Sequence, residues 1–239
     1  MKPDVHVFPS VREMACRLAQ ELEKMAKERT IAVALSGGDT PKPFLAFLAQ
    51  EYARKIDWPN IHFYWADERC VPASHPESNY GMAKERLFDR IPIPVCNIHR
   101  IVGENDPVTE AARYSEEIKS NLERLEGIPR FDLILLGIGT DGHTASIFPD
   151  QMHLLHSEQE CEVALHPRSG QKRITLTGRV IDHASRIVFL ATGEAKSYAI
   201  EKVLSEKPEA LAFPAFHIRP VHGVLEWFLD AQAAKGVSS

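Results

Sequence analysis

The sequence predicts an α/β protein with three layers, in which helices cover both faces of a mainly parallel sheet. Short apolar, β-branched runs alternate with longer segments of helical periodicity over most of the chain. Polar turns follow several of these runs, as they do at the carboxyl ends of parallel strands. The 239 residues contain no internal repeat, low-complexity segment or clear linker, so residues 1–239 are expected to form a single domain.

The first third of the chain is expected to alternate three strands with three helices. The expected strands cover 5–8, 30–35 and 61–66, and the expected helices cover 11–28, 43–55 and 79–89. Ser10 and Glu13 have the spacing of a capping box, which marks the start of the first helix. Pro43 lies near the first turn of the second helix, where a missing N–H costs nothing.

The rest of the chain is expected to complete the sheet. Residues 91–108 are predicted to be a loop with one strand-like piece at 98–102, and Thr109 is expected to cap a long helix that reaches about residue 126. Further strands are expected at 131–136, 187–191 and 224–229, with a strand pair at 162–165 and 173–177. A helix over 195–204 and an Ala-rich terminal helix are also expected.

Composition and charge limit the function classes. The net charge of −5 argues against broad nucleic-acid binding, although a few local cations can still bind one anion. The four widely spaced cysteines form no C-x-x-C pair, which favours free thiols in a reducing cytoplasm. The first residues lack the apolar core of a signal peptide and no apolar run reaches about 18 residues, so a cytoplasmic protein without a membrane partner is expected. The histidines show no metal-ligand spacing such as H-E-x-x-H, so neither a metal nor a cofactor is expected.

A glycine turn, Ser36-Gly37-Gly38-Asp39-Thr40, joins an expected strand to an expected helix. Its glycines let the backbone approach a ligand, and the following helix N-terminus presents free N–H groups, so a phosphate or another anion fits here. A plain tight turn is the alternative, and the P-loop pattern is absent. The turn also lies one residue from a nucleophile elbow, but only one expected strand precedes it, which disfavours a serine nucleophile.

A second glycine turn, over residues 137–142, matches G-x-G-x-x-G after an expected strand. A dinucleotide site needs a long helix that starts here, and Pro149 interrupts one within about two turns. We therefore favour a turn that holds Asp141 and His143 at a strand end. A structural histidine is the alternative.

Charged side chains lie at three further strand or helix ends. Asp67, Glu68 and Arg69 follow an expected strand, where acids can orient a ligand and a guanidinium can hold an anion; the alternative is a solvated exit with an internal ion pair. Lys196 lies at an expected helix start, where a cation is unfavourable unless an anion compensates it. Arg173 opens an expected strand. For both, an ordinary surface role is the alternative.

Together these motifs resemble the signature blocks of the 6-phosphogluconolactonase family, within the glucosamine-6-phosphate isomerase/6-phosphogluconolactonase superfamily. The blocks are Leu35-Ser-Gly-Gly-Asp-Thr-Pro41, Trp65-Ala-Asp-Glu-Arg69 with Glu77-Ser-Asn-Tyr-Gly81, Gly137-Ile-Gly-Thr-Asp-Gly-His-Thr-Ala-Ser-Ile-Phe-Pro149, Arg173-Ile-Thr-Leu-Thr177, Thr192-Gly-Glu-Ala-Lys196 and the tail 224–230. They cover nearly the whole chain. The resemblance implies a modified Rossmann-like fold of the deaminase/lactonase type and a cytoplasmic, metal-independent hydrolase of the pentose phosphate pathway.

The deaminases of the same superfamily are the nearest alternative. They carry a Glu shortly after the histidine, in an Asn-Glu-Pro-like end, and this acid assists opening of the sugar ring. Phe148 stands at that position here, directly before Pro149. A lactone needs no such acid because its carbonyl is already electrophilic, so Phe148 favours lactone hydrolysis. A non-catalytic sugar-phosphate sensor is a third reading, but the chain has no spare length for a DNA-binding domain.

The motifs and the resemblance assign a role to each candidate residue. His143 is expected to act as the general base that activates water against 6-phospho-D-glucono-1,5-lactone, with Asp141 or Asp67 orienting the imidazole or the sugar hydroxyls. The substrate and its phosphate are expected to bind Ser36, Gly37, Gly38, Thr40, Arg69, Arg173 and Lys196. The developing oxyanion is expected at Arg173 or at backbone N–H groups of the second glycine turn. Asp39 is left out of the phosphate site because an acid repels a phosphate unless it points away.

The expected partner is a small-molecule sugar phosphate lactone. Neither a nucleic acid nor a membrane is expected as a partner, and the chain is expected to be a monomer or a weak homodimer.

Overall fold

A six-stranded parallel sheet forms the centre of the computed structural model, which describes residues 3–205 and 207–237. The strand order is β1-β11-β10-β7-β2-β3, and every pairing along it is parallel. The strands are β1 (Asp4–Phe8), β2 (Ile31–Leu35), β3 (Ile61–Trp65), β7 (Leu133–Leu136), β10 (Arg186–Ala191) and β11 (Val224–Asp230). The expected α/β class with a mainly parallel sheet is confirmed.

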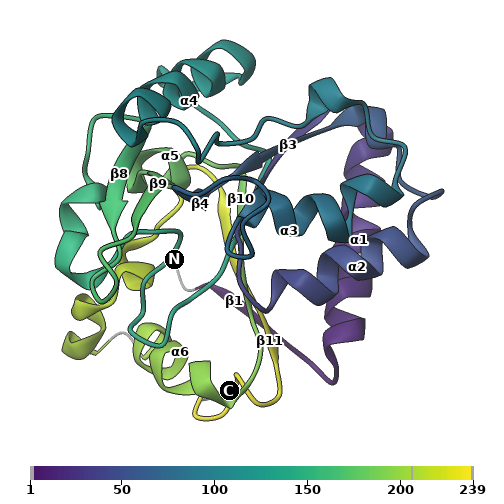
Figure 1. The fold of residues 1–239 in the computed structure, drawn as a ribbon. Coiled ribbons are helices and arrows are strands. Elements are labelled where there is room, and N and C mark those ends of the chain that lie inside the picture. Colours follow the sequence, from purple (N-terminus) through teal and green to yellow (C-terminus); the bar gives the residue numbers. More distant parts are fainter. Residues whose placement is uncertain (1–2, 206, 238–239) are drawn as a thin grey trace.

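Helices cover both faces of this sheet, as expected (Figure 1). On one side lie α1 (Val11–Glu28), α2 (Pro41–Glu51) and α3 (Asn79–Arg86). On the other side lie α4 (Pro107–Asn121), α5 (Gly178–Asp182) and α6 (Ser197–Leu204). No helix among the described residues is long and apolar enough to cross a bilayer.

A second, antiparallel sheet packs beside α4 and consists of β4 (Asp67–Arg69), β9 (Lys172–Leu176) and β8 (Cys161–Leu165). The strand pair expected at 162–165 and 173–177 is thereby confirmed. Residues 67–69 were expected as the exit of the preceding strand, but they form a strand of their own that pairs with β9. The chain therefore leaves the central sheet after Ala66. In the second sheet, Asp67 lies opposite Thr175 and Arg69 lies opposite Arg173. A short hairpin, β5 (Arg124–Leu125) with β6 (Ile128–Pro129), follows α4.

The capping prediction for the first helix is confirmed, because the Ser10 hydroxyl accepts the backbone N–H of Glu13 at 3.2 Å. The prediction for the long helix over 109–126 was wrong at both ends. Asp106 is its cap and accepts the N–H of Thr109 at 3.0 Å, and the helix ends at Asn121 because the hairpin takes over. Proline at the first helical position explains the earlier start.

Two weaker predictions were also wrong. The strand-like piece at 98–102 forms no strand, and only Ile98 makes an isolated bridge, to Phe63. The Ala-rich segment after β11 forms turns in place of a helix. Asp230 accepts the N–H of Ala233 at 2.7 Å and that of Gly193 at 3.1 Å, so the end of the sheet determines the path of this segment more strongly than helix propensity does.

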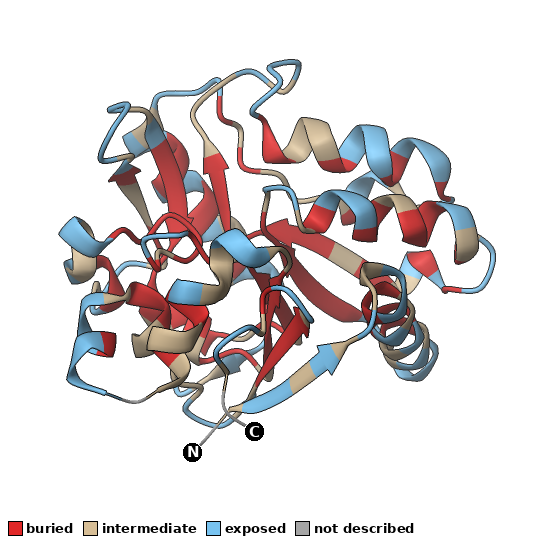
Figure 2. Ribbon diagram, turned by 90° about the horizontal axis from the view of Figure 1, so that it is seen from below, coloured by how far each residue is buried: buried red, intermediate tan, exposed pale blue. Residues whose placement is uncertain are grey.

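The core lies on both faces of the central strands. Every residue of β2 and β7 is buried, which explains their unbroken apolar runs, since parallel strands are covered on both faces (Figure 2). Trp227 and Phe189 stack across β11 and β10 with ring centroids 4.1 Å apart. Burial of such rings stabilises the fold through the apolar area removed from water, at roughly 25 cal/mol per Å². The sheet thus supports the loops at both ends of its strands.

Candidate active site

A pocket of about 340 Å³ lies at the carboxyl ends of β2, β7 and β10, beside β4. Because parallel strands present these ends at one edge of the sheet, segments far apart in the sequence meet there. Every expected site residue except Asp141 lines the pocket: Ser36, Gly37, Gly38, Thr40, Asp67, Arg69, His143, Arg173 and Lys196. The polar segments that follow Leu35, Ala66, Leu136 and Ala191 therefore form one site.

The central pair of the site is His143 and Asp141. Nδ1 of His143 lies 2.6 Å from Oδ1 of Asp141, and the backbone N–H of His143 donates to the same oxygen at 3.2 Å. Burial alone would raise the pKa of Asp141, but the hydrogen bond and charge of His143 outweigh burial and lower this pKa to about 2. Asp141 is therefore an anion that holds the imidazole proton on Nδ1, which leaves the lone pair of Nε2 free to act as a base.

The glycine turn makes room for this pair. A Cβ atom on Gly139 would lie 2.1 Å from Nδ1 of His143 and 2.4 Å from Oδ1 of Asp141, so only glycine fits. The N–H of Gly139 donates to the carbonyl of His143 at 2.8 Å, and the N–H of Gly142 donates to the carbonyl of Gly139 at 3.0 Å. The hydroxyl of Thr144 closes the turn on the carbonyl of Gly137 at 2.9 Å. The turn holds His143 rigidly at the end of β7.

Asp67 does not orient His143. This buried carboxylate accepts the hydroxyl of Ser146 at 2.7 Å, while its side chain lines the pocket. Of the two acids left open for the orienting role, only Asp141 forms a hydrogen bond with His143 among the described residues, so the geometry favours Asp141. Asp67 is placed to meet another part of a ligand.

The first glycine turn has the shape expected of an anion site. The hydroxyl of Ser36 is buried and has no partner among the described residues. Gly37 lets the side chain of Asn79 pack against the turn, since a Cβ there would lie 1.7 Å from its Oδ1, and Gly38 has a φ of 104° that favours glycine. The helix α2 begins directly after Thr40, whose side chain makes no capping hydrogen bond; because Pro41 and Pro43 carry no N–H, only Lys42 and Phe44 contribute N–H groups to its first turn.

Asp39 also lines this pocket, and its omission from the phosphate site stays a prediction. Its side chain is 98% exposed and pairs with Lys42 at 2.8 Å. This hydrogen bond is the main reason that the pKa of Asp39 is lowered.

Three cations enter the pocket without a carboxylate partner in the described part of the chain: Arg69, Arg173 and Lys196. Arg173 is only 8% exposed, makes no side-chain hydrogen bond among described residues, and its burial lowers its pKa. Arg69 donates only to the carbonyl of Glu77, at 2.6 Å, and its Nε is buried without a partner. Arg173 is buried, and Arg69 and Lys196 are half-buried. Because it is costly to remove an unpaired cation from water, an anionic ligand would stabilise all three.

Glu68, the other acid of this strand end, has a structural role. Its buried carboxylate accepts the N–H groups of Asn79 and Tyr80 at 2.8 and 2.7 Å and the hydroxyl of Ser78 at 3.1 Å. It therefore secures the start of α3, and the internal ion pair considered for Arg69 is not formed among the described residues.

Sequence reasoning missed two residues that line the pocket, Asn79 and Thr192, and also the contacts that Phe148 makes behind it. The side chain of Asn79 packs against the first glycine turn and donates to the carbonyl of Asp67 at 2.9 Å. The hydroxyl of Thr192 lies 3.0 Å from that of Thr40. Phe148 is fully buried, with its ring 4.8 Å from that of His143 and 5.6 Å from the guanidinium carbon of Arg173. All three stand inside recognisable motifs, but only the fold shows these contacts.

Comparisons with known proteins identify the family. The family model described as "Glucosamine-6-phosphate isomerases/6-phosphogluconolactonase" matches residues 9–227. A 6-phosphogluconolactonase of Haemophilus influenzae is 43% identical over 230 residues, which cover 95% of this chain and 97% of the relative. A 6-phosphogluconolactonase of Treponema pallidum is 40% identical over 202 residues, 84% of each chain.

Solved structures give the same result. A crystal structure named for the devB protein superposes with a TM-score of 0.95 at 41% identity and covers 98% of this chain and 99% of its own. The 6-phosphogluconolactonase of Leishmania guyanensis has a TM-score of 0.87 at 26% identity over the full length of both chains. The chain therefore belongs to the glucosamine-6-phosphate isomerase/6-phosphogluconolactonase family.

Proposed function

We propose that this chain hydrolyses 6-phospho-D-glucono-1,5-lactone to 6-phosphogluconate, as a carboxylic ester hydrolase of the oxidative pentose phosphate pathway. One observation carries the proposal: the His143–Asp141 pair faces a pocket that also contains Arg69, Arg173 and Lys196 without carboxylate partners. A base beside unpaired cations suits a substrate with an ester carbonyl at one end and a phosphate at the other. The relatives from Haemophilus influenzae and Treponema pallidum are named for this reaction.

His143 starts the reaction as a general base. Its Nε2 takes a proton from a water molecule while the water oxygen forms a bond to the lactone carbonyl carbon. The carbonyl π electrons move onto the oxygen, and collapse of this tetrahedral intermediate breaks the bond to the ring oxygen. The imidazolium returns its proton to that ring oxygen, which becomes a hydroxyl group. Such base catalysis contributes about 10²–10⁴ in rate.

Arg173 is our choice for the group that stabilises the oxyanion. Three N–H groups of the second glycine turn, those of Gly139, Gly142 and His143, already have acceptors within the turn. The guanidinium of Arg173 has none among the described residues, and it packs against Phe148, as does the ring of His143. A preorganised cation in a site that excludes water stabilises developing negative charge strongly.

The phosphate is assigned to the first glycine turn. Backbone N–H groups of Gly37, Gly38 and Thr40 would surround it, the hydroxyl of Ser36 would donate to it, and Lys196 and Arg69 would neutralise its charge. Asp67 is then left to accept a hydroxyl group of the sugar.

Position 148 carries a phenylalanine and no carboxylate, which favours lactone hydrolysis over deamination of an amino sugar. Ring opening of an aldose requires a proton carrier, and the buried Phe148 cannot supply one.

As part of the same proposal, the protein works as a single domain over residues 1–239, without a metal or cofactor, as a monomer or weak homodimer. We place it in the cytoplasm, where its free thiols would remain reduced, with no nucleic-acid or membrane partner.

A coupled assay tests the proposal. Fresh 6-phosphogluconolactone is supplied, 6-phosphogluconate is detected with its dehydrogenase, and spontaneous hydrolysis is subtracted. His143→Ala and His143→Asn should lose at least about 10²-fold in kcat while still binding 6-phosphogluconate. Near wild-type turnover in both variants would overturn the assignment of His143, and no turnover by the wild-type chain would overturn the function.

A further inference from the structure

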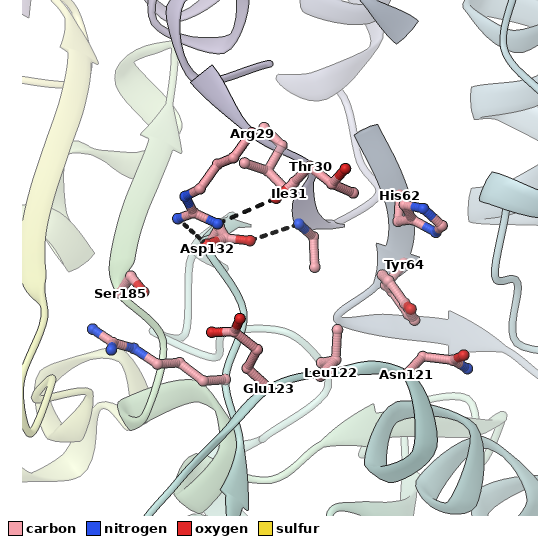
Figure 3. A pocket seen from close by; sticks show the side chains of 12 residues that line it. Arg29, Thr30, Ile31, His62, Tyr64, Asn121, Leu122, Glu123, Asp132 and Ser185 are labelled. Atoms are coloured by element: carbon pink, nitrogen blue, oxygen red, sulfur yellow. Dashed lines mark hydrogen bonds and ion pairs between the residues drawn. The ribbon is translucent and has the colours of Figure 1, made fainter. Parts of the chain in front are cut away.

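A second pocket, of about 310 Å³, lies at the opposite edge of the central sheet (Figure 3). It is formed where β2, β3, β7 and β10 begin, so the full length of the strands separates it from the site described above. Among the described residues, none lines both pockets. The catalytic proposal therefore gives this pocket no role.

The most informative residue in this pocket is Tyr64. It is only 1% exposed, yet its side chain lines the pocket, and Figure 3 shows it extending from β3 toward Asn121 and Leu122. Its ring stacks on that of His99 at a centroid distance of 4.3 Å, which fixes its direction. Within residues 3–205 and 207–237, no side chain or backbone group forms a hydrogen bond with its hydroxyl. Because Tyr64 lines the pocket, its hydroxyl is available to a ligand there.

Two of the charged residues of the pocket form an ion pair with each other, and two have no ion-pair partner among the described residues. Arg29 and Asp132 form an ion pair, and Asp132 also accepts the N–H of Ala32 at 2.7 Å. Arg130 and Glu123 make no ion pair within the described chain, and Nε of Arg130 is buried without an acceptor. One positive and one negative group thus remain free at the same pocket.

His62 adds a hydrogen-bond acceptor to this wall. Glu117 lies 2.9 Å from Nδ1 of His99, and Nε2 of His99 lies 2.9 Å from Nδ1 of His62. With a neutral His99, the carboxylate holds the His99 proton on Nδ1, so Nε2 of His99 accepts the Nδ1–H of His62. His62 then presents an unprotonated Nε2, and burial lowers the pKa of His62, which keeps it neutral.

We propose that this pocket binds a small zwitterion that carries one oxyanion group and one ammonium group. The oxyanion accepts from Arg130 and the Tyr64 hydroxyl, while the ammonium donates to Glu123 and to Nε2 of His62. A simple anion fits less well, because Glu123 and Asp132 would repel it. The volume lies at the small end of the range of ligand pockets, about 300–1,000 Å³, which limits the ligand to the size of an amino acid.

Amide NMR spectra of the full-length protein test this site directly. The zwitterionic probes are β-alanine, 4-aminobutyrate and O-phosphoethanolamine, which separate a carboxylate from a phosphate as the oxyanion. Butyrate and butylammonium each carry only one of the two charges. We expect at least one zwitterion to shift the amide signals of Leu122 and Ser185 saturably, with about tenfold higher affinity than either singly charged probe.

Variants identify the groups that bind. Arg130→Gln and Glu123→Gln should each weaken the best probe by about tenfold or more, and Tyr64→Phe by about fivefold, because each loses one polar contact. The matched exposed controls Arg124→Gln and Glu209→Gln should leave the affinity unchanged. The proposal fails if no zwitterion gives saturable shifts at Leu122 and Ser185, if butyrate or butylammonium binds equally well, or if Arg130→Gln binds like wild type. Lactonase activity is measured separately, so this failure is distinct from a failure of the catalytic proposal.

Discussion

Oδ1 of Asp141 lies 2.6 Å from Nδ1 of His143, and both residues belong to the same glycine turn at the end of β7. The proposed base and the acid proposed to orient it are therefore positioned by one local segment, without a contribution from a distant loop.

Replacement of Asp141 by Asn should lower kcat by about 10²–10⁴-fold with little change in affinity for 6-phosphogluconate, because an amide can hold the imidazole in the wrong tautomer. Asp150→Asn is a suitable control, since this exposed acid contacts only Gln151, at 3.3 Å. Steady-state kinetics with fresh lactone provide the measurement. A normal kcat for Asp141→Asn would show that the hydrogen bond to Asp141 does not matter for catalysis.

Gly139→Ala should reduce kcat strongly, because the added methyl group would lie 2.1 Å from Nδ1 of His143 and must displace the ring. A double-mutant cycle gives the decisive comparison. In a His143→Ala background the methyl group has no imidazole to displace, so Gly139→Ala should cost almost nothing further. Equal losses in both backgrounds would mean that the glycine acts through the turn itself.

The central sheet could be predicted from local pattern because its strands are buried on both faces and their apolar runs are unbroken. β4 could not, since its pairing with β9 joins Asp67 to Thr175, more than a hundred residues later. The segment after β11 is Ala-rich, yet it turns because Asp230 accepts the N–H of Ala233. In both places a specific tertiary contact decides the structure, and helix or strand propensity does not contain that information.

The residues of the site could also be predicted, but their pairing could not. Strand-end position and residue type were enough to place His143 and Lys196 at one edge, whereas Arg173 opens a strand and was assigned to the site only with the family resemblance. Which of Asp141 and Asp67 pairs with His143 depended on Ser146, whose hydroxyl donates a hydrogen bond to Asp67. Sequence spacing does not reveal which acceptor a buried hydroxyl will choose.

Lys196→Ala should weaken the preference for the phosphorylated lactone over glucono-1,5-lactone by about tenfold or more in kcat/KM, because the lysine neutralises the phosphate. Lys202→Ala removes a cation of α6, the helix that begins directly after Lys196; Lys202 does not line the pocket, so the preference should stay unchanged. The ratio of kcat/KM for the two lactones measures the effect. An unchanged ratio in Lys196→Ala would remove this lysine from the phosphate site.

Arg173→Met should lower kcat by about 10²–10³-fold and at the same time stabilise the protein. The guanidinium is 8% exposed and unpaired within the described chain, so its removal relieves a desolvation cost, while methionine keeps the packing on Phe148. A rise in Tm of about 2–4 °C is expected, which corresponds to ~1 kcal/mol for a chain of this size. Arg168→Met, at an exposed position, is the control for both measurements. A fall in Tm for Arg173→Met would show that the cation already has a stabilising partner.

Asp182→Asn should stabilise the protein at pH 8 and change its stability little at pH 4. Burial raises the pKa of Asp182 to about 7, although the N–H of Arg219, which donates to it at 2.8 Å, opposes the shift. An ordinary unfolded value is about 3.9, so between that pH and about 7 the folded state binds more protons than the unfolded state. The stability contribution of this acid is therefore full below about pH 4 and is lost as the pH rises toward 7. Asparagine keeps an oxygen that accepts the N–H of Arg219 and never carries the buried charge. Urea unfolding at the two pH values measures the difference, and an equal change at both would show that Asp182 is already ionised without cost in the folded protein.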